Sequence, residues 1–170
     1  MTPEGLALGP VGAAWLALAL AGPLAALGGL WDLRRMRIPN WLNAALALLF
    51  VPVAAATLPL EAALWRLGIA TAVLLVGYAL FAAGRMGGGD VKMLAAAALW
   101  IPPAQAGAAM FLLSVALLAG LVLVLAARRL TPSDTSWRGL RRHARRFPMG
   151  VSIAAALVAH LVLSLPPASA

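Results

Sequence analysis

Apolar stretches about as long as a bilayer is thick follow one another along most of this chain. About 20 consecutive apolar residues cross the hydrocarbon as a helix, and inside a bilayer only helices and closed barrels satisfy every backbone polar group. With 64% of its residues hydrophobic and 11% charged, the chain is expected to be an all-α polytopic membrane protein forming one membrane-embedded domain over residues 1–170. Breaks at charged residues and prolines predict about six transmembrane helices, at 10–31, 41–59, 62–83, 91–101, 106–127 and 147–165.

The basic residues predict how these spans are oriented. Twelve of the thirteen Lys and Arg fall in or beside the loops after the first, third and fifth spans, which leaves only Arg66 on the other side. Loops rich in Lys and Arg stay in the cytoplasm, so both termini are expected on the outer side. A net charge of +8 could indicate nucleic acid, but basic residues beside spans more often contact anionic lipid. We therefore expect a bilayer with anionic lipids as a partner and no nucleic acid.

The most basic segment, residues 128–147, carries seven arginines. Within it Trp137, Leu140, Ala144 and Phe147 recur at spacings of three or four, which predicts an amphipathic helix from about Thr135 on the membrane surface. A solvated basic loop on the cytoplasmic side is the alternative.

Two of the five acidic residues, Asp32 and Asp90, are predicted to reach the same face of the membrane. Asp32 ends the first span, and Asp90 opens the fourth directly after the glycine run 87–89. Ionised side chains near hydrocarbon are costly, so they are candidates for function. Glycines lack side chains and let another backbone approach closely, which would leave room for a substrate. The alternative is charge pairing of each aspartate with neighbouring Arg or Lys side chains.

Two carboxylates a few ångströms apart share a proton and so provide one acid and one base that can activate water. Proteolysis by such a pair needs no metal, cofactor or covalent intermediate, and a chain without cysteine has no thiolate nucleophile or thiolate zinc site. The helix macrodipole stabilises an anion where a helix begins and destabilises it where a helix ends. The dipole therefore favours Asp90 as the base, whereas the arginines near Asp32 could reverse this assignment.

Three segments of the chain resemble motifs of the type IV prepilin peptidases, membrane aspartic proteases of the Gly-x-Gly-Asp group. Gly87-Gly88-Gly89-Asp90-Val91-Lys92-Met93 resembles the Gly-x-Gly-Asp-x-Lys-Leu motif, with Met in place of Leu. Asp32, followed by Arg37-Ile38-Pro39-Asn40, resembles the first aspartate motif. Phe147-Pro148-Met149-Gly150 resembles the late Pro-aromatic-Gly segment, with Met149 in place of the aromatic residue. The likeness covers nearly the whole chain and is closest to the short peptidase-only branch that serves Flp/Tad pili.

The resemblance implies an endopeptidase with Asp32 and Asp90 as its catalytic residues. It would remove the leader of prepilin or pseudopilin precursors after a Gly, on the cytoplasmic side of the bacterial inner membrane. Longer members carry a cysteine-containing amino-terminal region and also methylate the product, so no methyltransferase activity is expected of this chain. Residues near the two aspartates are expected to support the site: Gly87, Gly89, Lys92, Arg37, Pro39 and Asn40.

Two other functions stay open at the level of the sequence. A presenilin-like intramembrane protease would use the same chemistry on a different client. A non-catalytic membrane subunit or small transporter would use the aspartates as proton or salt-bridge sites.

Overall fold

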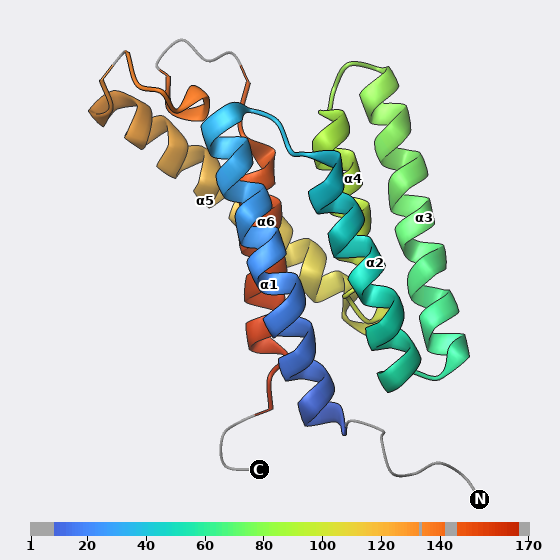
Figure 1. Ribbon diagram of the computed structural model, residues 1–170. Coiled ribbons are helices and arrows are strands. Elements are labelled where there is room, and N and C mark those ends of the chain that lie inside the picture. Colours follow the sequence, from blue (N-terminus) through green and yellow to red (C-terminus); the bar gives the residue numbers. More distant parts are fainter. Residues whose placement is uncertain (1–8, 133, 142–145, 167–170) are drawn as a thin grey trace, which may run out of the picture.

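The computed structural model describes residues 9–132, 134–141 and 146–166, and over these ranges the chain is all-helical, without a strand (Figure 1). This confirms that the fold is all-α. Six α-helices and two short 3-10 turns follow one another: α1 Pro10–Arg35, α2 Asn40–Thr57, α3 Leu60–Ala82, α4 Gly88–Ala98, η1 Pro103–Gln105, α5 Ala106–Leu130, η2 Arg138–Leu140 and α6 Met149–Leu163.

Among the described residues, four segments are long and apolar enough to cross a membrane. They are α1, α2, α3 and the continuous η1–α5 segment Pro103–Leu130. Helix α4 has 11 residues and α6 has 15, so at 1.5 Å per residue they measure about 16 and 22 Å against a hydrocarbon core of about 30 Å. The structure thus supports a membrane protein with four candidate spans, beside which two shorter helices pack.

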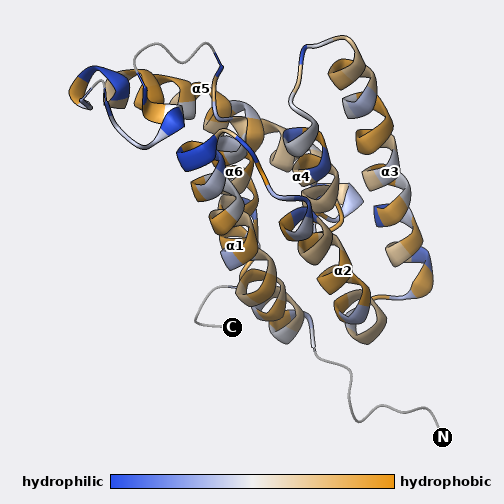
Figure 2. Ribbon diagram, turned by 45° about the horizontal axis from the view of Figure 1, so that its top comes forward, coloured by the Kyte–Doolittle hydropathy of each residue, from blue (hydrophilic) through white to orange (hydrophobic). Residues whose placement is uncertain are grey.

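The outward faces of the long helices are strongly apolar (Figure 2). Leu48 on α2, Phe111 on α5 and Leu123 on α5 are each 68% exposed, and α3 has only two buried residues. A water-soluble protein rarely exposes so much continuous apolar surface. These faces are suited to contact with lipid.

The helices form two packed groups. Helix α6 packs against α1 and α5, whereas α4 packs against α2 and α3. The tight contact of α1 with α6 depends on Gly29, because a Cβ there would lie 3.0 Å from Ala154 Cβ and 3.1 Å from Val151 Cα. The groups meet mainly where α1 contacts α2 and where α4 contacts α6.

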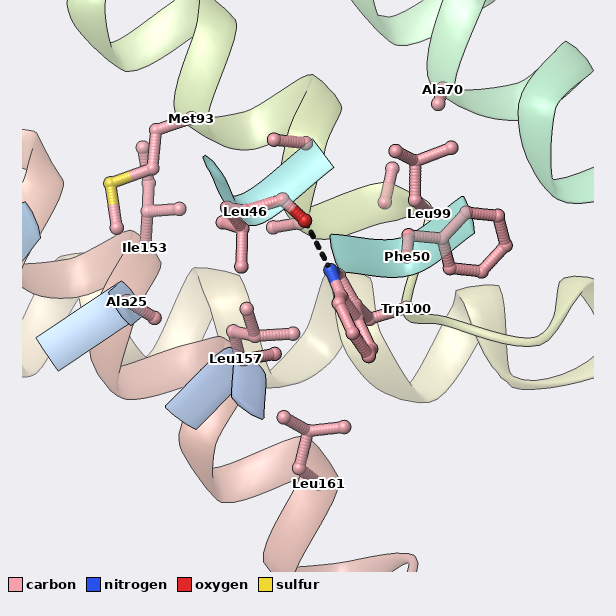
Figure 3. Close-up of a cluster of buried hydrophobic side chains, with 14 of the residues drawn as sticks. Ala25, Leu46, Phe50, Ala70, Met93, Leu99, Trp100, Ile153, Leu157 and Leu161 are labelled. Carbon is pink, nitrogen blue, oxygen red and sulfur yellow. Dashed lines mark hydrogen bonds between the residues drawn. The ribbon is translucent and has the colours of Figure 1, made fainter. Parts of the chain in front are cut away.

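A buried cluster fixes the two groups against each other (Figure 3). At the end of α4, Trp100 is 3% exposed; its Nε1 donates to the backbone oxygen of Leu46 at 3.0 Å, and its ring meets Phe50 edge-on at 5.8 Å between centroids. Met93 of α4 and Ile153 of α6 belong to the same cluster. Helix α4 is therefore held in register with α2 although it is short.

The α1–α2, α3–α4 and α5–α6 connections lie at one end of the bundle, and the beginning of α1 and the end of α6 lie toward the other (Figure 1). The first of these connections begins with Met36, a non-glycine residue in the left-handed conformation that ends α1.

The prediction of an amphipathic α-helix from about Thr135 is wrong over residues 134–141. That stretch contains only the 3-10 turn η2; the rest of the expected helix includes residues 142–145, outside the described ranges. The segment is held as a loop, because the Arg128 side chain donates to the backbone oxygens of Gly139 at 2.9 Å and Arg146 at 2.8 Å. Gly139 also lies against the end of α1, where a Cβ would be 2.5 Å from the Leu33 oxygen. A continuous helix would break these contacts.

Candidate active site

Asp32 lies in the last turn of α1 and is only 5% exposed. Its Oδ2 accepts a hydrogen bond from the backbone N–H of Gly150 at 2.9 Å, across 118 positions of sequence. Gly150 is the second residue of α6, and the first amides of a helix have no partner within the helix. The carboxylate therefore satisfies a donor that the fold itself leaves open.

Asp90 lies in the first turn of α4 and is half-buried. Its carboxylate folds back over Gly87, whose backbone N–H stabilises it. A Cβ on Gly87 would lie 2.5 Å from Asp90 Oδ2, so any side chain there would displace the carboxylate. The glycine run thus makes room for the aspartate that follows it.

Ile38 connects the surroundings of the two aspartates. This residue is 4% exposed. A Cβ added to Gly150 would lie 2.8 Å from Ile38 Cδ1, and a Cβ added to Gly89 would lie 3.2 Å from Ile38 Cβ. A Cβ on Gly150 would also lie 3.0 Å from Asp32 Oδ2, and Gly89 directly precedes Asp90. The structure therefore brings both predicted aspartates into one site.

The alternative of charge pairing finds no support in the described part of the chain. There, neither Asp32 nor Asp90 has an ion-pair partner. The Lys92 ammonium instead donates to Asn40 Oδ1 at 2.9 Å. The guanidinium groups of Arg34 and Arg35 lie over the rings of Trp137 and Trp31, at 4.7 and 4.9 Å from the ring centroids.

The residues expected to support the site fall into three groups. Gly87 and Gly89 adjoin Asp90 and Ile38 as described. The Lys92–Asn40 hydrogen bond joins the first turn of α4 to the first turn of α2, and Pro39 is the N-cap of α2 with φ −64°. Arg37 is different, because its side chain is exposed and lines a pocket with Arg34 and Arg35, next to Ile38, Pro39 and Asn40.

Sequence reasoning missed two contributors to the site. The first is Gly150, whose backbone N–H holds Asp32. The signal for it is Pro148, which is typical of a helix beginning, where the first backbone N–H groups have no partner within the helix. The second is Asn43 of α2, 4% exposed, whose Nδ2 donates to the Gly89 backbone oxygen at 3.2 Å. A buried amide in an apolar span was a signal that it bonds a neighbouring backbone.

The expected difference between the two aspartates in helix macrodipole does not hold. Asp32 closes α1, but its carboxylate meets the beginning of α6 at Gly150. Both carboxylates therefore face a helix beginning, and the macrodipole does not select Asp90 as the base.

The chemistry available to this site is that of the carboxylate pair. In the described ranges no group of three His, Cys, Asp or Glu lies together as a metal site would require. A carboxylate pair that shares one proton can take a proton from water and supply another to a substrate.

Comparison with known proteins agrees with this geometry. The sequence model of the type IV leader peptidase family matches residues 14–125, more than half of the chain, and this match includes both Asp32 and Asp90. No curated protein and no solved structure matches the chain. On the family match, the protein belongs to the type IV leader peptidase family.

Proposed function

We propose that the protein is an aspartic endopeptidase that removes the leader of type IV prepilins of the Flp type. The observation that carries this proposal is the meeting of Asp32 and Asp90 around Ile38, without an ion-pair partner for either carboxylate among the described residues. Buried carboxylates that only stabilised the fold would be expected to pair with a cation.

In the proposed reaction one carboxylate removes a proton from water as the water oxygen attacks the scissile peptide carbonyl. The protonated partner carboxyl donates to the developing oxyanion. The C–N bond then breaks as the carboxyl group that took the proton from water donates it to the leaving amine. The other carboxylate accepts a proton from a hydroxyl of the tetrahedral intermediate as the new carboxyl group forms, so the pair again holds one proton. Either aspartate can begin as the base, since both are stabilised by a backbone N–H.

A groove that begins at Lys92, two residues after Asp90, suits the apolar segment that follows a prepilin leader. It encloses about 490 Å³ between α2, α3 and α4, and it extends from Lys92 and Asn40 to Leu99. The residues that line it are apolar, apart from Asn40, Asn43, Thr71 and Lys92. A hydrophobic substrate helix lying there would have its polar junction at the Asp90 end.

The proposed topology has six spans, with α4 and α6 completing the set and the site facing the cytoplasm of the bacterial inner membrane. Its support is the charge distribution: twelve of the thirteen Lys and Arg fall in or beside three connections, which share the end of the bundle at which Asp32 and Asp90 lie. Positively charged loops are retained in the cytoplasm. No methyltransferase activity is proposed.

Co-expression with a Flp-type prepilin tests the function, with leader removal read from the mass of the pilin. Wild type is expected to cleave after the leader Gly, whereas Asp32→Asn and Asp90→Asn are expected to lose cleavage by about a hundredfold or more. Asp134→Asn removes a carboxylate that is exposed and serves as the matched control. Processing by Asp90→Asn at the wild-type rate would favour a non-catalytic role. Cleavage of clients without a junction Gly would favour a presenilin-like specificity.

A further inference from the structure

Four arginines line one pocket at the end of the bundle where α1 ends. The pocket encloses about 760 Å³ between the end of α1, the α1–α2 connection and the loop before η2. Hydrophilic residues gather there in Figure 2. Its cationic and aromatic lining, called here the arginine pocket, consists of Arg34, Arg35, Arg37, Arg138, Trp31 and Trp41.

The arginine pocket has an unbalanced positive charge. No Asp or Glu is among its described lining residues, and in the described part of the chain none of its four arginines forms an ion pair. Asp32, although near in sequence, is buried and bonded to Gly150. Like charges gathered in one cavity repel one another, so an anion bound among them would relieve this repulsion.

Aromatic contacts hold two of the guanidinium groups in position. Arg35 lies over Trp31 at 4.9 Å and Arg34 over Trp137 at 4.7 Å. Such stacking uses the faces of the guanidinium planes and leaves the N–H edges available for hydrogen bonds. Arginine edges bind phosphate oxygens in pairs, and a cavity of this size accommodates a small polar group together with its attachment.

The residues around the pocket indicate what kind of molecule would supply a phosphate group to these arginines. Trp31 and Trp41 meet edge-on at 6.4 Å between centroids, and Trp41 is 56% exposed beside the apolar outer face of α2. Tryptophans of membrane proteins gather at the level of the lipid headgroups, and basic pockets between helices at that level bind anionic headgroups. We propose that the arginine pocket binds the phosphate of an anionic phospholipid headgroup, with the acyl chains along α1 and α2.

Binding is measured by native mass spectrometry of the full chain in neutral detergent, titrated with phosphatidylglycerol or phosphatidylcholine. The wild type is expected to bind one phosphatidylglycerol saturably and phosphatidylcholine much more weakly. Each arginine near an anionic surface raises the affinity for the lipid roughly fivefold. The double variant Arg35→Gln with Arg138→Gln is therefore expected to bind phosphatidylglycerol roughly 25-fold more weakly.

The matched control removes the same charge from the same end of the bundle. Arg85 and Arg146 are exposed and lie outside the pocket, so Arg85→Gln with Arg146→Gln is expected to change affinity less than twofold. An equal loss in this control would overturn the proposal, because general surface charge would then explain the binding. Circular dichroism of both double variants shows that each is folded.

A third arm distinguishes a lipid from a free phosphate. Millimolar glycerol phosphate, which lacks acyl chains, is expected to displace phosphatidylglycerol poorly. Displacement at equal concentrations would instead assign the pocket to a soluble phosphate and overturn the lipid source. All of these readouts are binding measurements, so they hold whether or not the protein cleaves prepilins.

Discussion

The backbone N–H of Gly150 donates to Asp32 Oδ2 at 2.9 Å, which joins the beginning of α6 to the end of α1. The same glycine touches Ile38, whose other side faces Gly89. One residue of the last helix therefore sets the position of a carboxylate from the first.

Replacing Gly150 by Ala is expected to disturb Asp32. The new Cβ would lie 2.8 Å from Ile38 Cδ1 and 2.9 Å from Asp32 Cβ, so α6 or Asp32 must move. Overpacking of this kind costs about 1–3 kcal/mol, and we expect at least a tenfold loss of leader cleavage together with a lower thermal midpoint. The matched control is Gly68→Ala, where a Cβ meets nothing within 4 Å. Unchanged cleavage by Gly150→Ala would argue against a role for Asp32 geometry.

Replacing Gly87 by Ala is expected to displace the other carboxylate. A Cβ there would lie 2.5 Å from Asp90 Oδ2, so the side chain must rotate away from the N–H that stabilises it. We expect kcat for prepilin cleavage to fall at least tenfold with little change in KM, because the effect is on the reacting group. Gly88→Ala is the neighbouring control, since its Cβ would meet only the exposed Phe81 ring, at 3.3 Å. Equal losses in both variants would point to α4 as a whole rather than to Asp90.

The hydrogen bond between Lys92 and Asn40 is expected to couple α4 to α2 only weakly. Its donor and acceptor are 2.9 Å apart but exposed, so screening keeps its contribution near 0.5 kcal/mol. A double-mutant cycle of Asn40→Ala and Lys92→Met, read from unfolding in detergent, measures this coupling. A coupling of several kcal/mol would show that the bond is buried when the protein is in its membrane.

Trp100 is expected to matter for stability and not for chemistry. Trp100→Phe removes the Nε1 donor to Leu46 and leaves a buried backbone oxygen with one partner fewer, which costs about 1–3 kcal/mol. We expect a lower thermal midpoint and, below that temperature, leader cleavage within about twofold of wild type. A large loss of kcat with an unchanged midpoint would contradict this separation.

Much of the fold followed from local sequence. The charged and proline-containing breaks located α2, α3 and α5 to within a few residues, because bilayer-length apolar helices depend little on their neighbours. Asp32 and Asp90 were placed at the correct helix ends for the same reason.

The rest depended on tertiary contacts. Gly150 holds Asp32 across 118 positions, and no local pattern pairs residues at that separation. The helix expected from about Thr135 failed because Arg128, on a different element, bonds the backbone of the loop. The spacing of Trp137, Leu140 and Phe147 resembled a helix, but three apolar residues in a loop can also reach the bundle one by one.

The pairing of α1 with α6 also has a consequence for biosynthesis. Asp32 is synthesised before Asp90, but the amide that fixes Asp32 belongs to α6, which is synthesised after both. A chain synthesised only as far as α5 therefore has both acids but an incomplete centre, so completion of the site requires insertion of α6.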